Sequence, residues 1–429
     1  MLGWKLIDSG VYTLKFPMLK AEHENLACML LEKLLENPVG QEKLLTLLKE
    51  LCREKNLVVE KDAGMEILEV VKKTAFGFGI FDPLLADDNL EEISVSSLNT
   101  PIRVYVRKKG WQDTNALITS QEFLVNSINK MAKGLGRRIT TQNPRLNAVL
   151  PDGSRLHALI PPIALDGAEL TIRKFRKNPL SIADFIEGKT ISARAAAFLS
   201  LALETDVSIM ISGNTGSGKT SFLNALFTFV PSNERVVIVE ESPEISIPHP
   251  HKIRLAASEE LGVSLGDLVL DTLRMRPDRV IVGEVRSKDE VHALFDSLMA
   301  GQARGCYSTF HADSASETLS RLKSLGVSEQ DLGSLDLIIA LKRIALNGTE
   351  ERKAMEISEV NAGKVNALYA IGKDFFLEEK NLAKSRIVKK LCFSRAITYR
   401  QFLGLLEERE KEIQHVVDEK QVGKQSETK

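Results

Sequence analysis

Apolar residues recur at three- and four-residue spacing through LACMLLEKLL and EKLLTLLKELC, a pattern typical of amphipathic helices. Asn37-Pro38 and Gly40 interrupt this pattern and predict the end of one helix and the start of the next. We therefore expect residues 1–74 to form a helical N-terminal region.

The pattern changes to alternating apolar and polar positions after Asp82. IRVYVR predicts a strand, and LNAVL and RLHALI, separated by the PDGS turn, predict a hairpin. Thr119 and Glu122 match a capping box ahead of a helix in FLVNSINKMAK. With a further strand in ELTIRKF, these elements predict an α+β domain over residues 75–177.

Apolar runs that do not alternate follow in the second half of the chain. VSIMIS, RVVIVE, RVIVGE and CYSTFH are separated by helical stretches, the first of which begins at the predicted cap Ser192. Such runs are typical of a parallel sheet with helices on both faces, so residues 192–335 predict an α/β core. A preceding segment with Pro179 and Gly188 predicts a linker over residues 178–191.

Alternation returns near the C-terminus. DLIIALKRIA, KAMEISEV and VNALYAI, with a turn at Asn347-Gly348, predict an antiparallel meander. From Glu407 onward, 12 of 23 residues are charged, which predicts a solvated helix and a loose tail. We expect the meander, helices and tail to make up residues 336–429.

Composition narrows the classes of function. The 429 residues are 43% apolar and 27% charged with a net charge of −1, so a protein that coats nucleic acid is not expected. Four widely spaced cysteines fit neither a disulfide framework nor a zinc site and indicate a reducing compartment. Neither a signal peptide nor a membrane-spanning segment is predicted, so we expect a soluble intracellular protein.

The sharpest chemical signal is GNTGSGKT, which directly follows an apolar strand and directly precedes the helical SFLNALF. Glycines allow a tight turn that directs backbone N–H groups at phosphate oxygens. The alternative interpretation is a glycine-rich turn between strand and helix that binds no ligand. Lys219 would reach the β- and γ-phosphates, and the Thr220 hydroxyl would bind Mg²⁺. The residues predicted to bind ATP are Gly213, Asn214, Thr215, Gly216, Ser217, Gly218, Lys219, Thr220 and Ser221.

Acidic residues follow two of the apolar strands. VIVGE ends in Glu284, which would hold Mg²⁺ through water or polarise the attacking water. VVIVE ends in Glu240, and Glu241 and Glu244 follow. Because ligands of open α/β sheets bind at the carboxyl ends of the strands, we expect Glu284 and at least one of Glu240 and Glu244 to act on the nucleotide. Solvated side chains beyond a strand are the alternative interpretation.

Histidines and arginines supply the remaining candidates. His311 ends the strand CYSTFH and is a candidate sensor of the γ-phosphate, although a lone histidine is more often structural. His249 and His251 have no carboxylate or cysteine at ligand spacing, so no metal site is expected there. Arg155 and Arg173 are candidates to contact phosphate from the neighbouring domain. Further candidates for phosphate contact, ATP sensing or salt bridges between subunits are Arg137, Arg138, Arg274, Arg276 and Arg286.

Four segments resemble the Walker A motif, Asp box, Walker B motif and His box of secretion ATPases: GNTGSGKT, VVIVEESPEI, LRMRPDRVIVGEVR and GQARGCYSTFHADS. This superfamily includes the motors of type II and type IV secretion systems, type IV pili and archaella. The resemblance covers about residues 75–360. The form GQARG looks most like the archaeal branch, and Glu241 stands where the Asp box often has Asp.

The resemblance implies a PAS-like domain over residues 75–177 and a RecA-like P-loop ATPase core over residues 192–335. It also implies homo-hexameric rings with ATP at the interface between subunits. By this resemblance, Lys219 and Thr220 belong to the Walker A motif and Glu284 to the Walker B motif. Glu240 and Glu244 fall in the Asp box, and His311 falls in the His box. Arg155 and Arg173 match arginines that reach the nucleotide from the N-terminal domain.

The implied function is a Mg²⁺-dependent ATPase motor at the cytoplasmic face of the cell membrane, working with a membrane platform protein of a pilus or secretion machine. Two alternatives stay open. A DNA-transfer motor could use the same core, although the sequence has no basic stripe interleaved with aromatic residues. A nucleotide-gated scaffold without hydrolysis is the other, and the presence of Lys219, Glu284 and His311 argues against it.

Overall fold

The computed structural model describes residues 2–7, 10–107, 109–175, 179–258, 261–346, 349–371 and 379–427. The chain divides into two compact units, Met1–Lys177 and Asn178–Lys429. The turn predicted at Asn347-Gly348 lies outside the described residues.

An antiparallel sheet in the order β1-β4-β3-β2-β7-β6-β5 organises the first unit. The hairpin predicted around the PDGS turn is confirmed as β5 and β6. The helix after β4 is capped by Ser120, whose Oγ accepts from the Phe123 N–H, so the predicted cap at Thr119 is wrong by one residue. The elements of this unit are β1 (Trp4–Leu6), α1 (Ala21–Glu36), α2 (Leu44–Glu54), α3 (Lys61–Phe76), α4 (Asp82–Ala86), β2 (Leu90–Val95), β3 (Pro101–Val106), β4 (Gly110–Ile118), α5 (Gln121–Ala132), β5 (Arg145–Val149), β6 (Arg155–Leu159) and β7 (Glu169–Arg173).

The N-terminal helices pack on the sheet of the same unit. Leu30 of α1 and Ile67 of α3 are fully buried in one apolar cluster with Ile93 of β2 and Ile172 of β7. The N-terminal region is not entirely helical, because β1 pairs with β4 and extends the sheet. Helices and sheet thus share a single core.

The second unit contains the predicted parallel sheet, in the order β10-β9-β11-β12-β8-β13-β14-β15. Pairing is parallel from β10 to β13 and antiparallel from β13 to β15, so the predicted meander continues the same sheet. The strands are β8 (Ile209–Gly213), β9 (Val236–Glu240), β10 (Lys252–Ala256), β11 (Arg279–Val282), β12 (Gly305–Phe310), β13 (Leu337–Leu346), β14 (Thr349–Asn361) and β15 (Lys364–Ala370). The helices are α6 (Ile182–Glu187), α7 (Ala193–Leu203), α8 (Lys219–Leu226), α9 (Leu265–Thr272), α10 (Lys288–Met299), α11 (Ala315–Ser324), α12 (Glu379–Lys384), α13 (Arg386–Ser394) and α14 (Tyr399–Glu427).

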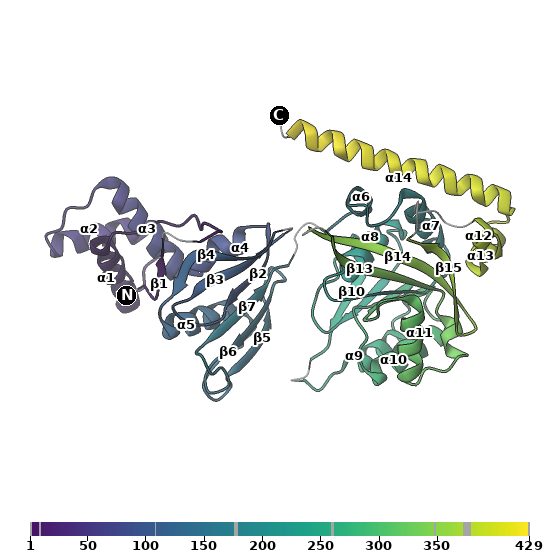
Figure 1. Cartoon of the computed structure of the whole chain (residues 1–429). Helices are drawn as coiled ribbons and strands as arrows, with labels where there is room; N and C mark the ends of the chain where they lie inside the picture. Colours follow the sequence, from purple (N-terminus) through teal and green to yellow (C-terminus); the bar gives the residue numbers. More distant parts are fainter. Residues whose placement is uncertain are drawn as a thin grey trace. The chain divides into compact units, whose positions relative to one another are not determined.

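Helices cover both faces of this sheet, as the apolar runs predicted. Successive residues of a strand enter different cores: Ile209 and Ile211 join one apolar cluster, whereas Met210 between them joins the other. Figure 1 shows α9, α10 and α11 on one face, and α6, α7, α8 and α13 on the other. A strand that is buried on both faces has no polar side, which explains why its sequence does not alternate.

The segment predicted as a linker contains helix α6. Ser181 and Asp184 form a reciprocal capping box at its start, and Phe185 packs edge-on against Phe222 of α8 with ring centroids 5.1 Å apart. The short helix is thereby part of the second unit rather than a free connection.

The C-terminal residues predicted as a loose tail are helical as far as Glu427. Phe402 and Leu406 of α14 are fully buried in the core that also contains α7. Farther along α14, Lys420 Nζ donates to Ser181 Oγ (2.9 Å) and Asp184 Oδ2 (2.8 Å) at the start of α6. The charged residues of α14 therefore form one face of a helix whose apolar residues pack on the core of the second unit.

Across the described residues, the structure contains no helix that is both long enough and apolar enough to span a membrane.

Candidate functional site

The loop between β8 and α8 has the shape that its glycines allow. At Gly213, a Cβ atom would lie 2.3 Å from the carbonyl oxygen of Leu341 on β13, so only glycine lets the two backbones approach this closely. Gly218 has a φ of 91° and forms the N-cap of α8. Lys219, Thr220 and Ser221 then occupy the first turn of the helix, where the backbone N–H groups and the helix dipole favour an anion.

The Lys219 side chain is buried under this loop, with 8% of its surface exposed. Its Nζ donates to the carbonyl oxygens of Gly213 (3.0 Å) and Asn214 (3.4 Å). The same Nζ lies 3.5 Å from Nδ1 of His311 and 3.9 Å from Oε1 of Glu284. His311 and Glu284, which belong to separate sequence motifs, therefore lie beside the ammonium group of Lys219.

His311 and Glu284 form a close pair at the ends of β12 and β11, with His311 Nε2 2.8 Å from Glu284 Oε1. Burial and the charge of Lys219 lower the pKa of His311, and these effects outweigh the opposing charge of Glu284. A neutral imidazole in this position must donate from Nε2 to the carboxylate, which leaves Nδ1 as an acceptor facing Lys219. The geometry thus assigns the tautomer of His311.

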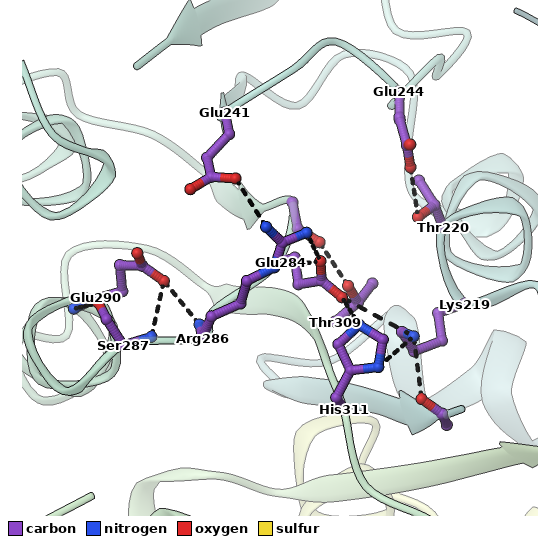
Figure 2. A network of polar contacts seen from close by, with 12 residues as sticks. Lys219, Thr220, Glu241, Glu244, Glu284, Arg286, Ser287, Glu290, Thr309 and His311 are labelled. Atoms are coloured by element: carbon purple, nitrogen blue, oxygen red, sulfur yellow. Dashed lines mark hydrogen bonds and ion pairs between the residues drawn. The ribbon is translucent and has the colours of Figure 1, made fainter. Parts of the chain in front are cut away.

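Arg286 links Glu284 to the loop after β9. Its Nε donates to Glu284 Oε2 at 2.8 Å, and its Nη2 contacts the same oxygen. Its Nη1 donates to Glu241 Oε2 at 3.1 Å. Figure 2 shows Glu241, Arg286, Glu284, His311 and Lys219 in succession across the site.

The two acidic residues selected from the Asp box have different surroundings. Glu240 is buried, and its Oε1 accepts from the N–H groups of Glu244 (2.7 Å) and Ile245 (2.8 Å), so it shapes the loop. Burial raises the pKa of Glu240, although these N–H groups and Arg254 favour its ionised form. Glu244 instead lies at the P-loop, where its Oε2 accepts from Thr220 Oγ1 at 3.1 Å.

Several supporting residues carried no motif in the sequence. Asn224, one turn after Thr220 on α8, accepts from the Ser246 N–H (3.0 Å) and donates to the Glu244 carbonyl (3.4 Å). Its polar side chain within the apolar SFLNALF was the available signal. Arg352 of β14 donates from Nε to the Gly216 carbonyl at 3.0 Å, and the Arg343 N–H of β13 donates to Asn214 Oδ1 at 3.1 Å. The meander therefore supports the P-loop from outside the predicted core.

Oxygen donors suited to Mg²⁺ are present at the site. Thr220 Oγ1 faces Glu244 Oε2. Glu284, which was predicted to hold the metal together with Thr220, contacts His311 and Arg286. A hydroxyl and nearby carboxylates are the hard oxygen ligands that Mg²⁺ prefers. Within the described ranges, no group of three or more His, Cys, Asp or Glu side chains could bind a metal ion by itself.

Arg155 and Arg173 lie in the first unit, on β6 and β7, whereas the P-loop lies in the second. They are direct cross-strand partners, and Glu92 of β2 pairs with Arg173 on its other side. The like charges of Arg155 and Arg173 thus face each other across the two strands, with the Glu92 carboxylate next to Arg173.

The remaining candidates have local contacts. Arg137 donates to the Asn147 carbonyl, and Arg274 pairs with Asp271 at 3.5 Å. His249 packs edge-on against Phe227, and His251 Nε2 lies 2.7 Å from Arg235 Nη1. Arg276 has a φ of 50°, in the left-handed region of the backbone.

The comparisons with known proteins agree with the four motifs. The family described as "Type II/IV secretion system protein" matches residues 88–425. The uncharacterized protein MJ0781 of Methanocaldococcus jannaschii is 41% identical over 234 residues, which cover 52% of this chain and 32% of that protein. The chain thus spans about a third of that relative's length.

Two further proteins are similar over more of their own length. The putative conjugal transfer protein Rv3659c of Mycobacterium tuberculosis is 34% identical over 286 residues, 63% of this chain and 77% of that protein. The X-ray structure of the Legionella pneumophila ATPase DotB is 18% identical, with a TM-score of 0.48, over 73% of this chain and 84% of that chain.

Proposed function

The chain belongs to the type II/IV secretion system protein family, and from this premise we propose that it is a Mg²⁺-dependent ATPase that drives a secretion, pilus or archaellum machine. The observation that carries the proposal is the convergence of Lys219, His311 and Glu284 at the carboxyl end of a parallel sheet, beneath a P-loop. An ammonium, a neutral imidazole and a carboxylate at one phosphate-binding loop are suited to phosphoryl transfer to water.

Each side chain has a role in this proposal. The predicted P-loop residues, from Gly213 to Ser221, bind the phosphates, and Lys219 neutralises charge on the β- and γ-phosphates. Glu284 orients and polarises the attacking water through its carboxylate. His311 holds Oε1 of Glu284 and senses the γ-phosphate. Glu240 acts indirectly, because its Oε1 fixes the loop that carries Glu244.

Mg²⁺ fits the oxygen donors at this site. Thr220 is proposed as a direct ligand, with Glu244 and Glu284 holding the ion through water. When bound, the ion would neutralise charge on the phosphate oxygens. We expect phosphate release from ATP by the purified protein to stop when EDTA removes Mg²⁺ and to return when Mg²⁺ is restored in excess. Hydrolysis that continues in EDTA would contradict the assignment.

The arginines of the first unit suggest a ring. We propose that a PAS-like domain presents Arg155 and Arg173 to ATP bound by the RecA-like core of a neighbouring chain in a homo-hexamer. The adjacent positions of the two arginines on β6 and β7 support this role. Closed rings are the usual result of head-to-tail contacts between identical chains.

Mixing two variants that are each expected to hydrolyse ATP more slowly than the wild type tests the ring. Lys219→Ala lacks the P-loop ammonium, and Arg173→Ala lacks the arginine that is proposed to act on a neighbour's ATP. A mixed ring contains sites with Lys219 from one chain and Arg173 from the other, so we expect the mixture to hydrolyse ATP faster than either variant alone. Mixtures no more active than the separate variants would contradict action between subunits.

A DNA-transfer motor is the second candidate, because the M. tuberculosis relative is named a putative conjugal transfer protein. The near-neutral charge of the chain favours the first candidate. We further propose a cytoplasmic location at the inner face of the membrane, with a membrane platform protein as the partner. Strong stimulation of hydrolysis by DNA that weakens with added salt would favour the second candidate.

A further inference from the structure

Arg286 contacts two carboxylates at the rim of the site. Its guanidinium contacts Glu284 through Nε (2.8 Å) and Nη2, and contacts Glu241 through Nη1 (3.1 Å), while 55% of its side chain is exposed. Exposed ion pairs contribute about 0–1 kcal/mol to stability. Stability alone therefore gives little reason for this arrangement next to a P-loop.

The contacts of Arg286 divide the two oxygens of Glu284 between different neighbours. Oε2 lies on the guanidinium, while Oε1 lies 2.8 Å from His311 Nε2 and 3.9 Å from Lys219 Nζ. A glutamate side chain is flexible, and ordering it costs free energy. A planar guanidinium that holds one oxygen fixes the orientation of the whole carboxylate and directs the other oxygen toward the P-loop.

Arg286 is itself held from two directions. Its backbone N–H donates to Glu290 Oε2 (2.7 Å), part of the capping box that Ser287 and Glu290 form at the start of α10. Its side chain is held by Glu241, which lies in the loop after β9. Figure 2 shows both attachments together with the contact to Glu284. The guanidinium is thus placed by two elements that are distant in the sequence.

We propose that Arg286 is a positioning residue for Glu284 and that Glu241 is its anchor; this inference rests on the proposed ATPase function. The residue acts through Glu284 and makes no contact with the nucleotide. Its loss leaves phosphate binding by Lys219 intact and removes the fixed orientation of the carboxylate. The chemical step is therefore affected more than binding.

The test compares steady-state hydrolysis by the wild type and by Arg286→Ala in the full-length chain. We expect kcat to fall about tenfold or more while KM for ATP changes less than about twofold. Arg286→Lys should recover part of the rate, because lysine keeps the charge but not the planar fork. Added guanidinium ion should raise kcat of Arg286→Ala and not of the wild type, an effect that a purely structural role would not produce.

Arg304 provides a matched control. It is also half-exposed and also bridges two carboxylates, with Nε 2.8 Å from Asp206 and Nη1 2.7 Å from Glu234, but it precedes β12 at the opposite end of the sheet. We expect Arg304→Ala to keep the wild-type kcat. Equal loss of kcat in both variants, together with equally lowered unfolding midpoints, would overturn the positioning role of Arg286.

The anchor is tested by a double-mutant cycle. Glu241→Gln should lower kcat less than Arg286→Ala, and the double variant should be no slower than Arg286→Ala alone. If the two substitutions lowered kcat independently, so that their fold-losses multiplied in the double variant, the proposed role of Glu241 as the anchor of Arg286 would be wrong. Wild-type kcat in Arg286→Ala would overturn the inference while leaving the ATPase proposal in place, whereas absence of hydrolysis in the wild type would overturn both.

Discussion

Both ends of the parallel sheet carry an arginine that bridges carboxylates, and the two ends differ in burial. At the amino end, Arg279 is 0% exposed, and its Nε lies 2.5 Å from Glu234 Oε2. At the carboxyl end, Arg286 is 55% exposed and joins Glu284 to Glu241. Similar chemistry thus occurs in two very different dielectric environments.

The amino-end network is saturated with hydrogen bonds. Arg279 donates to the carbonyls of Leu203 (3.1 Å) and Thr205 (3.2 Å) and to the Tyr307 hydroxyl (2.7 Å), besides Glu234. Burial raises the pKa of Tyr307 above its ordinary value, so its hydroxyl stays protonated. A charge that is buried and fully bonded holds the strands in place and has no freedom to respond to a ligand.

The carboxyl-end network contributes little to stability but converges on the P-loop. Its ion pairs are partly exposed, and pairs of that kind are weak in water. Their value lies in placing Glu284 and His311 beside Lys219. Under the proposed function, the amino end of the sheet maintains the fold and the carboxyl end performs the chemistry. Variants at each end can separate the two roles.

The largest effect is expected at Lys219. Lys219→Ala should abolish ATP hydrolysis and nucleotide binding, because water cannot replace an ammonium held under the loop at 8% exposure. Equilibrium binding of a labelled ATP analogue measures the loss. Lys323→Ala serves as the control and should bind ATP normally. It removes an exposed lysine of α11 that pairs with Glu329. Undiminished binding of ATP by Lys219→Ala would contradict the proposed role of the carboxyl end of the sheet in nucleotide binding.

The structural half is tested at Arg279. Arg279→Met should lower the free energy of unfolding by about 3–5 kcal/mol. The buried Glu234 then loses its buried partner and keeps the half-exposed Arg304, and the Tyr307 hydroxyl and two buried carbonyls lose their donor. Urea unfolding measures this change. Adding Glu234→Gln to the variant should recover part of the loss, since a buried carboxylate that lacks its buried partner is then replaced by a neutral amide. If the free energy of unfolding fell by less than about 1 kcal/mol, Arg279 would contribute no more than an exposed ion pair, which would contradict its structural role.

The pH dependence of hydrolysis sharpens the role of His311. Burial and Lys219 lower the pKa of His311 below its ordinary 6.5, so the imidazole is neutral at neutral pH and becomes charged only in more acidic solution. We expect the rate to be constant above pH 6.5 and to fall below it, as Nδ1 gains a proton and repels Lys219. His311→Gln keeps a donor and an acceptor, so it should flatten this acidic limb. An unchanged limb in His311→Gln would assign the titration to another group.

The smallest effect is expected at Arg304. The Arg304 side chain is 46% exposed, and Glu234 keeps its contact with the buried Arg279 when Arg304 is removed. Arg304→Ala should therefore lower the free energy of unfolding by about 1 kcal/mol or less. The loss should be far below that of Arg279→Met, although both arginines contact Glu234. Equal losses would show that exposure does not separate the two arginines.

The sequence predicted that the central residues of the candidate site lie close together, because of where they stand along the chain. Lys219, Glu284 and His311 each stand next to an apolar strand, and parallel strands bring their carboxyl ends to one edge. The family assigned from the four motifs is confirmed by the match over residues 88–425. Short motifs at strand ends were thus sufficient to identify the family.

Contacts between distant elements could not be predicted. The path of the loop after β9 decides that Glu244 faces Thr220 while Glu240 faces backbone N–H groups, and the sequence shows three similar glutamates. The contact of Arg286 with Glu241 joins residues 45 positions apart. In α14, the dense charge obscured an apolar stripe that packs against the core.

The most direct test of the division between the two ends is Glu284→Gln, with turnover, ATP binding and unfolding measured on the same preparation. This change keeps the shape of the side chain and removes the charge that contacts Arg286 and His311. We predict that ATP still binds, that the free energy of unfolding changes by less than about 1 kcal/mol, and that turnover falls more than about tenfold, a barrier increase of about 1.4 kcal/mol. Turnover at the wild-type rate, or a slowed rate that is accompanied by a large loss of stability, would contradict the account.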